Sequence, residues 1–199
     1  MKKIVALFLL LISLKALAIP PTDWMYLVTK DRFGLIEKTT TYNDLINLFG
    51  KEALKDETRS GPEGEGEYKC TVVYGGTELE MVVYWKEKQG HKRLVGVECS
   101  QRNSPYHTTD SVKIGSTLTD LVKANKAAIA FYGFGWDYSG LITNYYRGRL
   151  EKAKVFFTLG WDGKNDTALL GDGELSSTMP KVIKRAKQVK VAAMRIAFE

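Results

Sequence analysis

The chain has 199 residues, of which 44% are hydrophobic, 11% aromatic and 26% charged, with 18 glycines and two cysteines. These proportions are typical of a folded protein with a hydrophobic core, and they exclude a disordered polyelectrolyte and a disulfide-packed miniprotein. The formal net charge is +6, but three lysines lie in the first eighteen residues, which contain no acid, so the remainder carries only +3. This small excess argues against a nucleic-acid-binding protein.

Residues 1–18 have the pattern of a signal peptide. Met1-Lys2-Lys3 precedes a predominantly apolar run at 4–14, and Ala16-Leu17-Ala18 supplies a small-residue cleavage site. A transmembrane helix needs about 20 apolar residues, and this run ends too early at Lys15. No cysteine for lipid attachment lies near the site, and no later segment could span a bilayer. We therefore predict cleavage near Ala18 and a periplasmic or secreted protein with no transmembrane segment.

The chain shows an internal similarity at a shift of 76 residues. That shift aligns residues 41–46 with 117–122 and, unchanged, residues 81–85 with 157–161, so that a tryptophan matches a tryptophan. Two separated blocks that agree on one shift indicate a duplication. We predict two tandem repeats after the signal peptide, at 19–109 and 110–199.

Each repeat begins with a helix-start signal. Thr41 and Thr117 are predicted N-caps, and Asp44 and Asp120, three residues later, complete an acidic variant of the capping box. Apolar residues then recur at helical spacing. The predicted helix ends are Gly50 in the first repeat and Asn125, in a left-handed conformation, in the second.

Short runs rich in valine and aromatic residues follow each helix and predict antiparallel strands. Helices followed by such strands, twice, predict an α+β fold with helices covering one face of a sheet. Residues 52–67 predict a mobile acidic loop, and the C-terminal segment fits either a helix from 181 or, as we favour, a strand from about Gln188. The predicted strands are Trp24–Thr29, Tyr68–Tyr74, Leu79–Trp85 and Arg93–Cys99, then Ile129–Phe134, Leu141–Tyr146 and Ala153–Trp161.

Cys70 and Cys99 are candidates for one disulfide if the protein is exported. On the first and third strands of a simple meander, however, they would lie roughly 10 Å apart, beyond disulfide reach. Two buried free thiols are the alternative. The two histidines, His91 and His107, have no ligand spacing with these cysteines, so we expect no zinc site.

Motifs of catalysis and cofactor binding are not complete anywhere in the sequence. The glycine groups form neither a dinucleotide fingerprint nor a phosphate loop, and Asp137-Tyr138-Ser139-Gly140 lacks the first glycine of a nucleophile elbow. Residues 162–166 resemble the start of a calcium loop, but Lys164 occupies a ligand position. We therefore expect a non-catalytic protein without cofactor or metal.

Residues 131–138 contain five aromatic side chains with glycines between them. Such a segment can form a recognition surface, because tyrosine and tryptophan supply contact area at small entropic cost. The competing interpretation is structural, with alternate aromatics filling the core of a small sheet. The candidate contact residues are Tyr132, Phe134, Trp136, Asp137 and Tyr138.

Each Thr-x-x-Asp-Leu helix entry, followed by strands that end near Trp85 or Trp161, resembles the tandem repeat of the β-lactamase inhibitor protein fold. Gly115-Ser116-Thr117 is also similar to the helix entry of SmpA/OmlA-type envelope modules. The resemblance implies an exported, non-catalytic protein that presents a sheet surface to another protein. An alternative from a different class is a carbohydrate-binding protein or glycoside hydrolase that uses the aromatic segment and Asp137.

Overall fold

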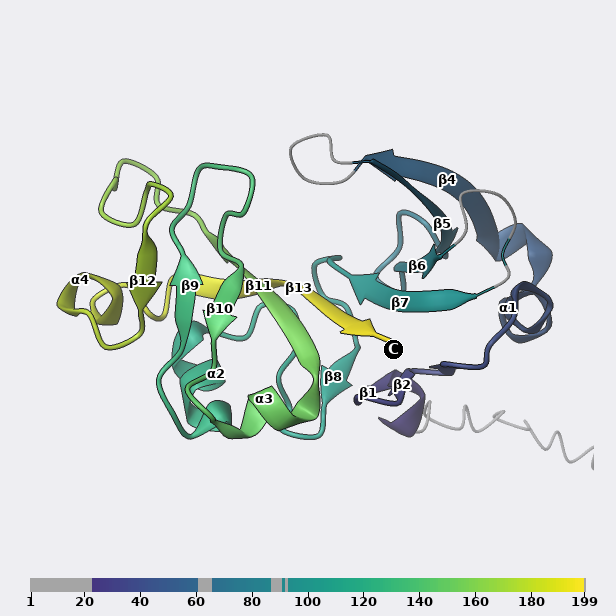
Figure 1. Ribbon diagram of the computed structural model, residues 1–199, viewed down its shortest axis with the longest axis horizontal. Coiled ribbons are helices and arrows are strands. Elements are labelled where there is room, and N and C mark those ends of the chain that lie inside the picture. Colours follow the sequence, from purple (N-terminus) through teal and green to yellow (C-terminus); the bar gives the residue numbers. More distant parts are fainter. Residues whose placement is uncertain (1–22, 61–65, 87–90, 92, 199) are drawn as a thin grey trace, which may run out of the picture.

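The computed structural model describes residues 23–60, 66–86, 91 and 93–198. The predicted signal peptide, the turn at Gln89-Gly90 and positions 61–65 of the predicted acidic loop lie outside these ranges. The described chain has a mixed α+β fold, as predicted (Figure 1).

The largest sheet has six strands in the order β11-β13-β7-β6-β5-β4, and all its pairs are antiparallel. Two smaller sheets have the orders β3-β2-β1-β8 and β10-β9-β12. The strands of the large sheet are β4 (Leu54–Ser60), β5 (Glu67–Val73), β6 (Met81–Trp85), β7 (Leu94–Cys99), β11 (Val155–Trp161) and β13 (Val189–Ala197). The other strands are β1 (Leu27–Val28), β2 (Arg32–Phe33), β3 (Ile36–Glu37), β8 (His107–Thr108), β9 (Ala130–Tyr132), β10 (Ile142–Asn144) and β12 (Glu174–Ser176). The helices are η1 (Asp23–Tyr26), α1 (Tyr42–Phe49), η2 (Lys51–Ala53), α2 (Leu118–Asn125), α3 (Arg149–Ala153) and α4 (Pro180–Ile183).

Both predicted capping boxes are confirmed. The hydroxyl of Thr41 accepts a hydrogen bond from the backbone N–H of Asp44 (3.2 Å), whose carboxylate accepts one from the N–H of Thr41 (2.8 Å). Thr117 and Asp120 repeat this arrangement at 3.1 and 3.0 Å. These bonds satisfy N–H groups that a helix start otherwise leaves without partners, which is why both helices begin where the sequence predicts.

The two helices end differently from each other. Gly50 follows α1 with φ of +83°, as predicted. At the end of α2 the left-handed residue is Lys126 (φ +57°), and Asn125 is the last helical residue. The prediction for Asn125 is therefore wrong. Its side chain is fully buried and bonded to neighbouring backbone, so it serves the core rather than the turn.

The similarity between the two halves extends to the turn before each helix. Glu37 and Thr40 exchange two hydrogen bonds there, and Lys113 and Ser116 exchange the same two 76 positions later. Beyond the helices the halves differ. Strands β4 to β7 form a meander, whereas the later strands are divided between the three-stranded sheet and the six-stranded sheet. The fold class is α+β, but the tandem repeat is not confirmed.

Two local predictions are corrected by strand pairing. Residues 54–60, predicted as part of a loop, form β4, which pairs along its whole length with β5. The strand could not be predicted from its polar sequence. It forms nevertheless, because a strand at the edge of a sheet tolerates charged residues. The segment Trp24–Thr29, predicted as a strand, begins as η1 and is extended only at β1.

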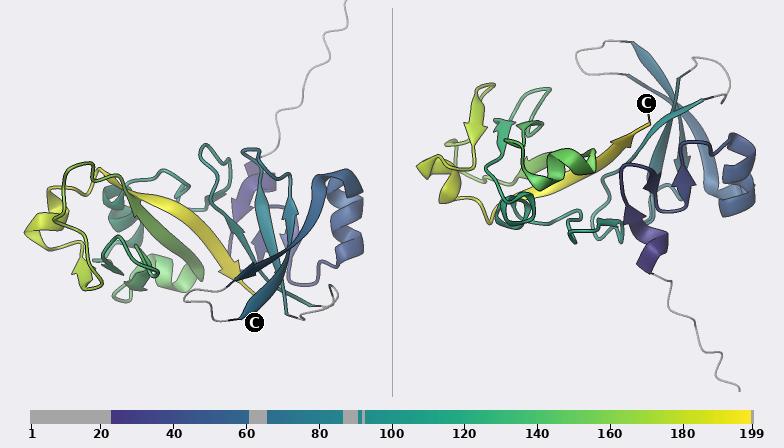
Figure 2. Two further views of the ribbon diagram at one scale, coloured as in Figure 1. Left: turned by 90° about the horizontal axis from the view of Figure 1, so that it is seen from above. Right: turned by 60° about the horizontal axis from the view of Figure 1, so that its bottom comes forward.

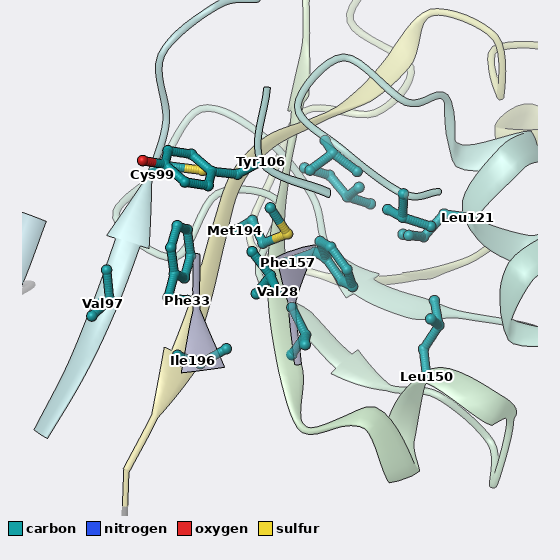
Figure 3. Packing of buried hydrophobic residues seen from close by; sticks show 14 of the residues in the cluster. Val28, Phe33, Val97, Cys99, Tyr106, Leu121, Leu150, Phe157, Met194 and Ile196 are labelled. Atoms are coloured by element: carbon teal, nitrogen blue, oxygen red, sulfur yellow. The ribbon is translucent and has the colours of Figure 1, made fainter. Parts of the chain in front are cut away.

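Strand β13 joins the two halves. The C-terminal segment from Val189 is a strand, as favoured from the sequence, and it pairs with β7 on one side and β11 on the other. Figure 3 shows Met194 and Ile196 of this strand between Phe33 and Val97 on one side and Phe157 and Leu150 on the other. These side chains belong to one core cluster that draws on both halves of the chain.

Cys70 and Cys99 are buried free thiols, so of the two alternatives left open by the sequence the structure has the free thiols and not the disulfide. The strands that carry them are separated by β6, and the two side chains lie on opposite faces of the sheet. Cys99 belongs to the core cluster, whereas Cys70 pairs with Tyr84 on the other face. Burial raises the pKa of the Cys99 thiol to about 12.

Candidate functional site

The core cluster lies against one face of the six-stranded sheet, and α1 and the short strands β1 and β2 lie on that side (Figure 1). The other face, which we call the open face, is defined by a row of directly paired residues that crosses all six strands. No member of this row belongs to the core cluster among the residues described. From β11 to β4 the row reads Phe156, Arg195, Glu98, Val82, Val72 and Lys55, of which Val82 and Val72 are buried.

A groove of about 320 Å³ lies on the open face where the two halves meet. Its base is formed by small residues of β13, Ala193 and Ala197, and Phe156 of β11 lies beside them. Leu141, from the connection between β9 and β10, forms a further part of the lining. Phe156 is 48% exposed and Leu141 is 39% exposed. Large apolar side chains are therefore accessible next to one another on a sheet surface, which is a common property of interaction sites.

Two residues of opposite charge lie side by side in the lining of this groove. Glu98 on β7 and Arg195 on β13 are direct register partners, and both line the groove. Burial raises the pKa of Glu98, while the positive charges of Arg195 and Arg59 act in the opposite direction. A half-buried carboxyl beside an exposed guanidinium gives the groove a polar centre between its apolar sides.

Tyr84 extends this polar centre toward β5. The guanidinium of Arg195 lies over the Tyr84 ring, 5.7 Å from its centre, which is a cation–π distance. Arg59 of β4 forms a hydrogen bond with the Tyr84 side chain. Burial, followed by the charge of Glu98, raises the pKa of this tyrosine, which therefore stays neutral. Arg195 thus lies over the ring of Tyr84, and Arg59 interacts with the hydroxyl of the same side chain.

The predicted aromatic contact residues lie in and beside the connection between β9 and β10, but they do not form one strip. Phe134 is only 5% exposed and packs against Phe131 and Trp161, so it is a core residue. Asp137 is exposed. Tyr132, Trp136 and Tyr138 are half-buried. Phe134 thus fits the structural interpretation, whereas the other four residues are accessible as a recognition surface requires.

Tyr132, Trp136 and Tyr138 form a compact aromatic group. The ring of Trp136 lies 5.2 Å from each of the two tyrosine rings, at 80° and 61°, and its indole N–H donates to the carbonyl of Gly133. Such edge-to-face packing fixes the rings against one another.

This connection is tied to the groove through its last residues. The N–H of Leu141 donates to the carbonyl of Tyr138, and the carbonyl of Gly140 accepts a hydrogen bond from the N–H of Leu159 on β11 (2.8 Å). Gly140 has φ of +71°, and a Cβ there would lie 1.9 Å from the Leu159 carbonyl oxygen. Only glycine permits this approach, which brings Leu141 to the groove.

A second polar and aromatic cluster lies near the start of α1. The carboxylate of Asp56 contacts His91 (3.1 Å) and accepts hydrogen bonds from Thr71 (2.7 Å) and Tyr42 (3.3 Å), whose ring stacks on His91 at 4.1 Å. Trp85 donates to Thr71 at 3.0 Å. These bonds join α1 to β4, β5 and β6, so the cluster has a structural role.

The segment that resembles a calcium loop is used differently. Asp166 accepts hydrogen bonds from Arg185, including one of 3.0 Å from Nη2, and this contact lowers the pKa of the carboxyl. Within the described residues, no group of three or more His, Cys, Asp or Glu side chains could hold a metal ion. Nor does the described part of the chain contain a helix long and apolar enough to cross a membrane.

Local motifs of the sequence do not identify the groove residues. Phe156, Arg195 and Glu98 each lie on a different strand, and their strands are brought together only by the pairing of β13. The available signal was the alternation within β13, where buried residues alternate with Ala192 and Arg195 on exposed positions. That alternation identifies an exposed side of the strand but not its neighbours.

No protein-family model and no curated protein matches the sequence. Among solved structures, the chain is similar to the crystal structure of the uncharacterized protein YfeY from Escherichia coli, with a TM-score of 0.52 and 13% sequence identity. The match covers 86% of this chain and 99% of that chain. At this identity the likeness concerns the fold alone.

Proposed function

We propose that the protein binds a protein partner through the groove on the open face of the six-stranded sheet. The observation that carries the proposal is the pair of exposed apolar side chains, Phe156 and Leu141, beside the Glu98–Arg195 pair. Burying a phenylalanine side chain contributes about 1.5–3 kcal/mol, and a guanidinium selects a partner carboxylate by bidentate hydrogen bonding. The partner surface would therefore present an apolar side chain close to an acidic one.

The resemblance to tandem-repeat inhibitor proteins supports the same mode of action, since it implies contact with a partner through a sheet. The aromatic group of Tyr132, Trp136 and Tyr138, with exposed Asp137, would form the rim of the contact surface. Tyr138 is three residues from Leu141, which lines the groove. Rigid aromatic side chains at a rim add contact area at little entropic cost.

Site-specific photo-crosslinking in producing cells tests the proposal. A photoreactive phenylalanine analogue is placed at Phe156, and the matched control carries it at Tyr146, which is equally exposed at 48% but outside the groove. We expect a discrete adduct with one protein from position 156, absent from position 146 and lost in an Arg195→Glu background. Identical adducts from both positions, or an adduct unaffected by Arg195→Glu, would contradict binding at the groove.

The contribution of the rim is tested in the same cells. Trp136→Ala combined with Tyr138→Ala should weaken the adduct from position 156 without abolishing it. An unchanged adduct would remove the aromatic group from the contact surface.

We also propose that the protein is exported after removal of residues 1–18. The support is the basic, apolar and small-residue pattern of that segment. Fractionation of producing cells and N-terminal sequencing of the product provide the test. A product that retains Met1 and fractionates with cytoplasmic markers would contradict export.

A further inference from the structure

Helix α4 carries exposed apolar side chains at the end of the molecule. It lies at one extreme of the long axis, far from β4, β5 and α1 (Figures 1 and 2). Val182 faces the core and is fully buried, whereas Ile183 is 59% exposed and Met179 is 36% exposed. Met179 is the N-cap of α4, and its carbonyl accepts hydrogen bonds from the N–H groups of Val182 and Ile183, so the two exposed apolar residues belong to one turn.

Lysine side chains surround this apolar pair. Lys181, Lys184 and Lys187 are exposed, and none has an acid within ion-pair distance among the residues that the structure describes. Two acids of this part of the molecule have other partners, since Asp166 binds Arg185 and Glu174 accepts a hydrogen bond from Thr143. We call Met179, Lys181, Ile183, Lys184 and Lys187 the basic tip.

All charged side chains between residues 175 and 198 are positive. Between residues 175 and 198 the sequence contains six lysines and arginines and no aspartate or glutamate. The tip is also held firmly, because Val182 is buried in the core and Arg185 binds both Asp166 and the carbonyl of Lys181 (2.9 Å). A charged surface that is ordered before binding loses little conformational entropy when it docks.

We propose that the basic tip docks on the surface of an anionic lipid membrane. Lysines next to a membrane are attracted by anionic headgroups, and exposed apolar side chains between them can enter the boundary between headgroups and acyl chains. A nucleic acid, or a polypeptide of acidic residues alone, would pair with the lysines but would leave Ile183 without an apolar environment. The combination of Ile183 and Met179 with three unpaired lysines therefore favours lipid.

Docking through the tip is compatible with the groove on the open face. The tip lies beyond β12 in the views of Figures 1 and 2, whereas the groove lies over β11, β13 and β7. The two surfaces are formed by different residues. A membrane-bound molecule would thus keep Phe156 and Arg195 available, although the lipid proposal does not depend on the protein-binding proposal.

Vesicle cosedimentation tests the docking. Protein purified from producing cells is mixed with vesicles of phosphatidylcholine alone or with about one-third phosphatidylglycerol, at low and high salt. The test variant carries Lys181→Glu, Lys184→Glu and Lys187→Glu. The control carries Lys38→Glu, Lys51→Glu and Lys123→Glu, which change the net charge equally at exposed positions elsewhere.

We expect the parent protein and the control to bind the anionic vesicles more than the neutral ones, and less at high salt. The tip variant should lose at least about tenfold in partitioning, because each lysine near an anionic surface contributes about fivefold. Equal partitioning of the tip variant and the control, or equal binding to both vesicle types, would overturn the proposal.

An environment-sensitive fluorophore distinguishes lipid contact from charge attraction alone. The label is attached to Ile183→Cys and, as a control, to Thr39→Cys, since both native cysteines are buried. Emission from position 183 should shift to shorter wavelength with anionic vesicles and should stay unchanged with an acidic polypeptide or nucleic acid. A tip that binds these polymers as strongly as vesicles, without a shift at position 183, would overturn lipid docking.

Discussion

The side-chain amide of Asn125 lies directly against the α-carbon of Gly148. A Cβ at Gly148 would come within 2.2 Å of Asn125 Oδ1. The amide nitrogen of Asn125 donates to the carbonyls of Ala127, Ala128 and Tyr145, and Oδ1 accepts a hydrogen bond from the N–H of Leu150. One buried side chain therefore joins the end of α2 to the turn before α3.

Replacement of this asparagine should destabilise the protein strongly. Asn125→Ala leaves several buried backbone groups without partners, and each such group costs about 1–3 kcal/mol. We expect a decrease of about 3 kcal/mol in the free energy of unfolding, measured by urea denaturation, and a similar loss for Gly148→Ala through steric overlap. The control Asn43→Ala, at an exposed position on α1, should change stability by less than about 0.5 kcal/mol. Equal effects of Asn125→Ala and Asn43→Ala would contradict this role.

The capping box of α2 predicts a specific dependence on pH. Hydrogen bonds from Thr117 lower the pKa of Asp120. The stabilisation is therefore complete above the unfolded pKa of about 3.9 and is lost as pH falls through the lower folded value. Thr117→Ala should cost about 1 kcal/mol at pH 7, and its difference from the parent should shrink below about pH 3. Denaturant titrations of the parent and the variant at pH 7 and below about pH 3 measure this difference in stability, with exposed Thr39→Ala as the control.

Glu98 predicts a pH dependence of stability that is opposite in sign to that of Asp120. Its pKa is raised chiefly by burial, so the charged form is disfavoured in the folded protein. The resulting penalty is present above the folded pKa and disappears below the unfolded value of about 4.3. Glu98→Gln should therefore raise the urea midpoint at pH 8 and have little effect near pH 4. A lower midpoint at pH 8 would show that the attraction to Arg195 exceeds the burial cost. Exposed Glu78→Gln is the matched control.

The free thiols can be counted chemically. In the folded protein at pH 8, Cys70 and Cys99 should react slowly with a disulfide reagent, because both are buried and burial raises both pKa values. After unfolding without reductant, two thiols per chain should react. If none reacts until a reductant is added, the cysteines are joined in a disulfide and the assignment of free thiols is wrong.

Much of the local structure could be predicted from the sequence alone. Thr41 with Asp44 and Thr117 with Asp120 determine two helix starts, because a capping box needs only residues three positions apart. The strands β5, β6 and β7 follow from short runs of valine and aromatic residues, which favour extended backbone whatever their neighbours.

Other elements depended on partners distant in the sequence. Residues 54–60 are too polar to predict a strand, yet β4 forms because β5 offers a complete row of backbone hydrogen bonds. Asparagine is a common turn residue, but the backbone of Tyr145 and Leu150 supplies hydrogen-bond partners that hold the Asn125 side chain in the core. Local preference is weak compared with such bonds in a buried setting.

The same distinction applies to the candidate sites. The capped helices and the charge excess of the lysine cluster follow from the sequence alone, because each depends on neighbours along the chain, and the sequence also favoured a strand at the C-terminus. Only the folded structure places Cys70 and Cys99 on opposite sides of a sheet, buries Phe134, and brings Phe156, Arg195 and Glu98 into one row. Those relationships depend on which strands pair and in which register. A shift of one residue would exchange the two faces, and the register is fixed by the core that β13 completes between the two halves.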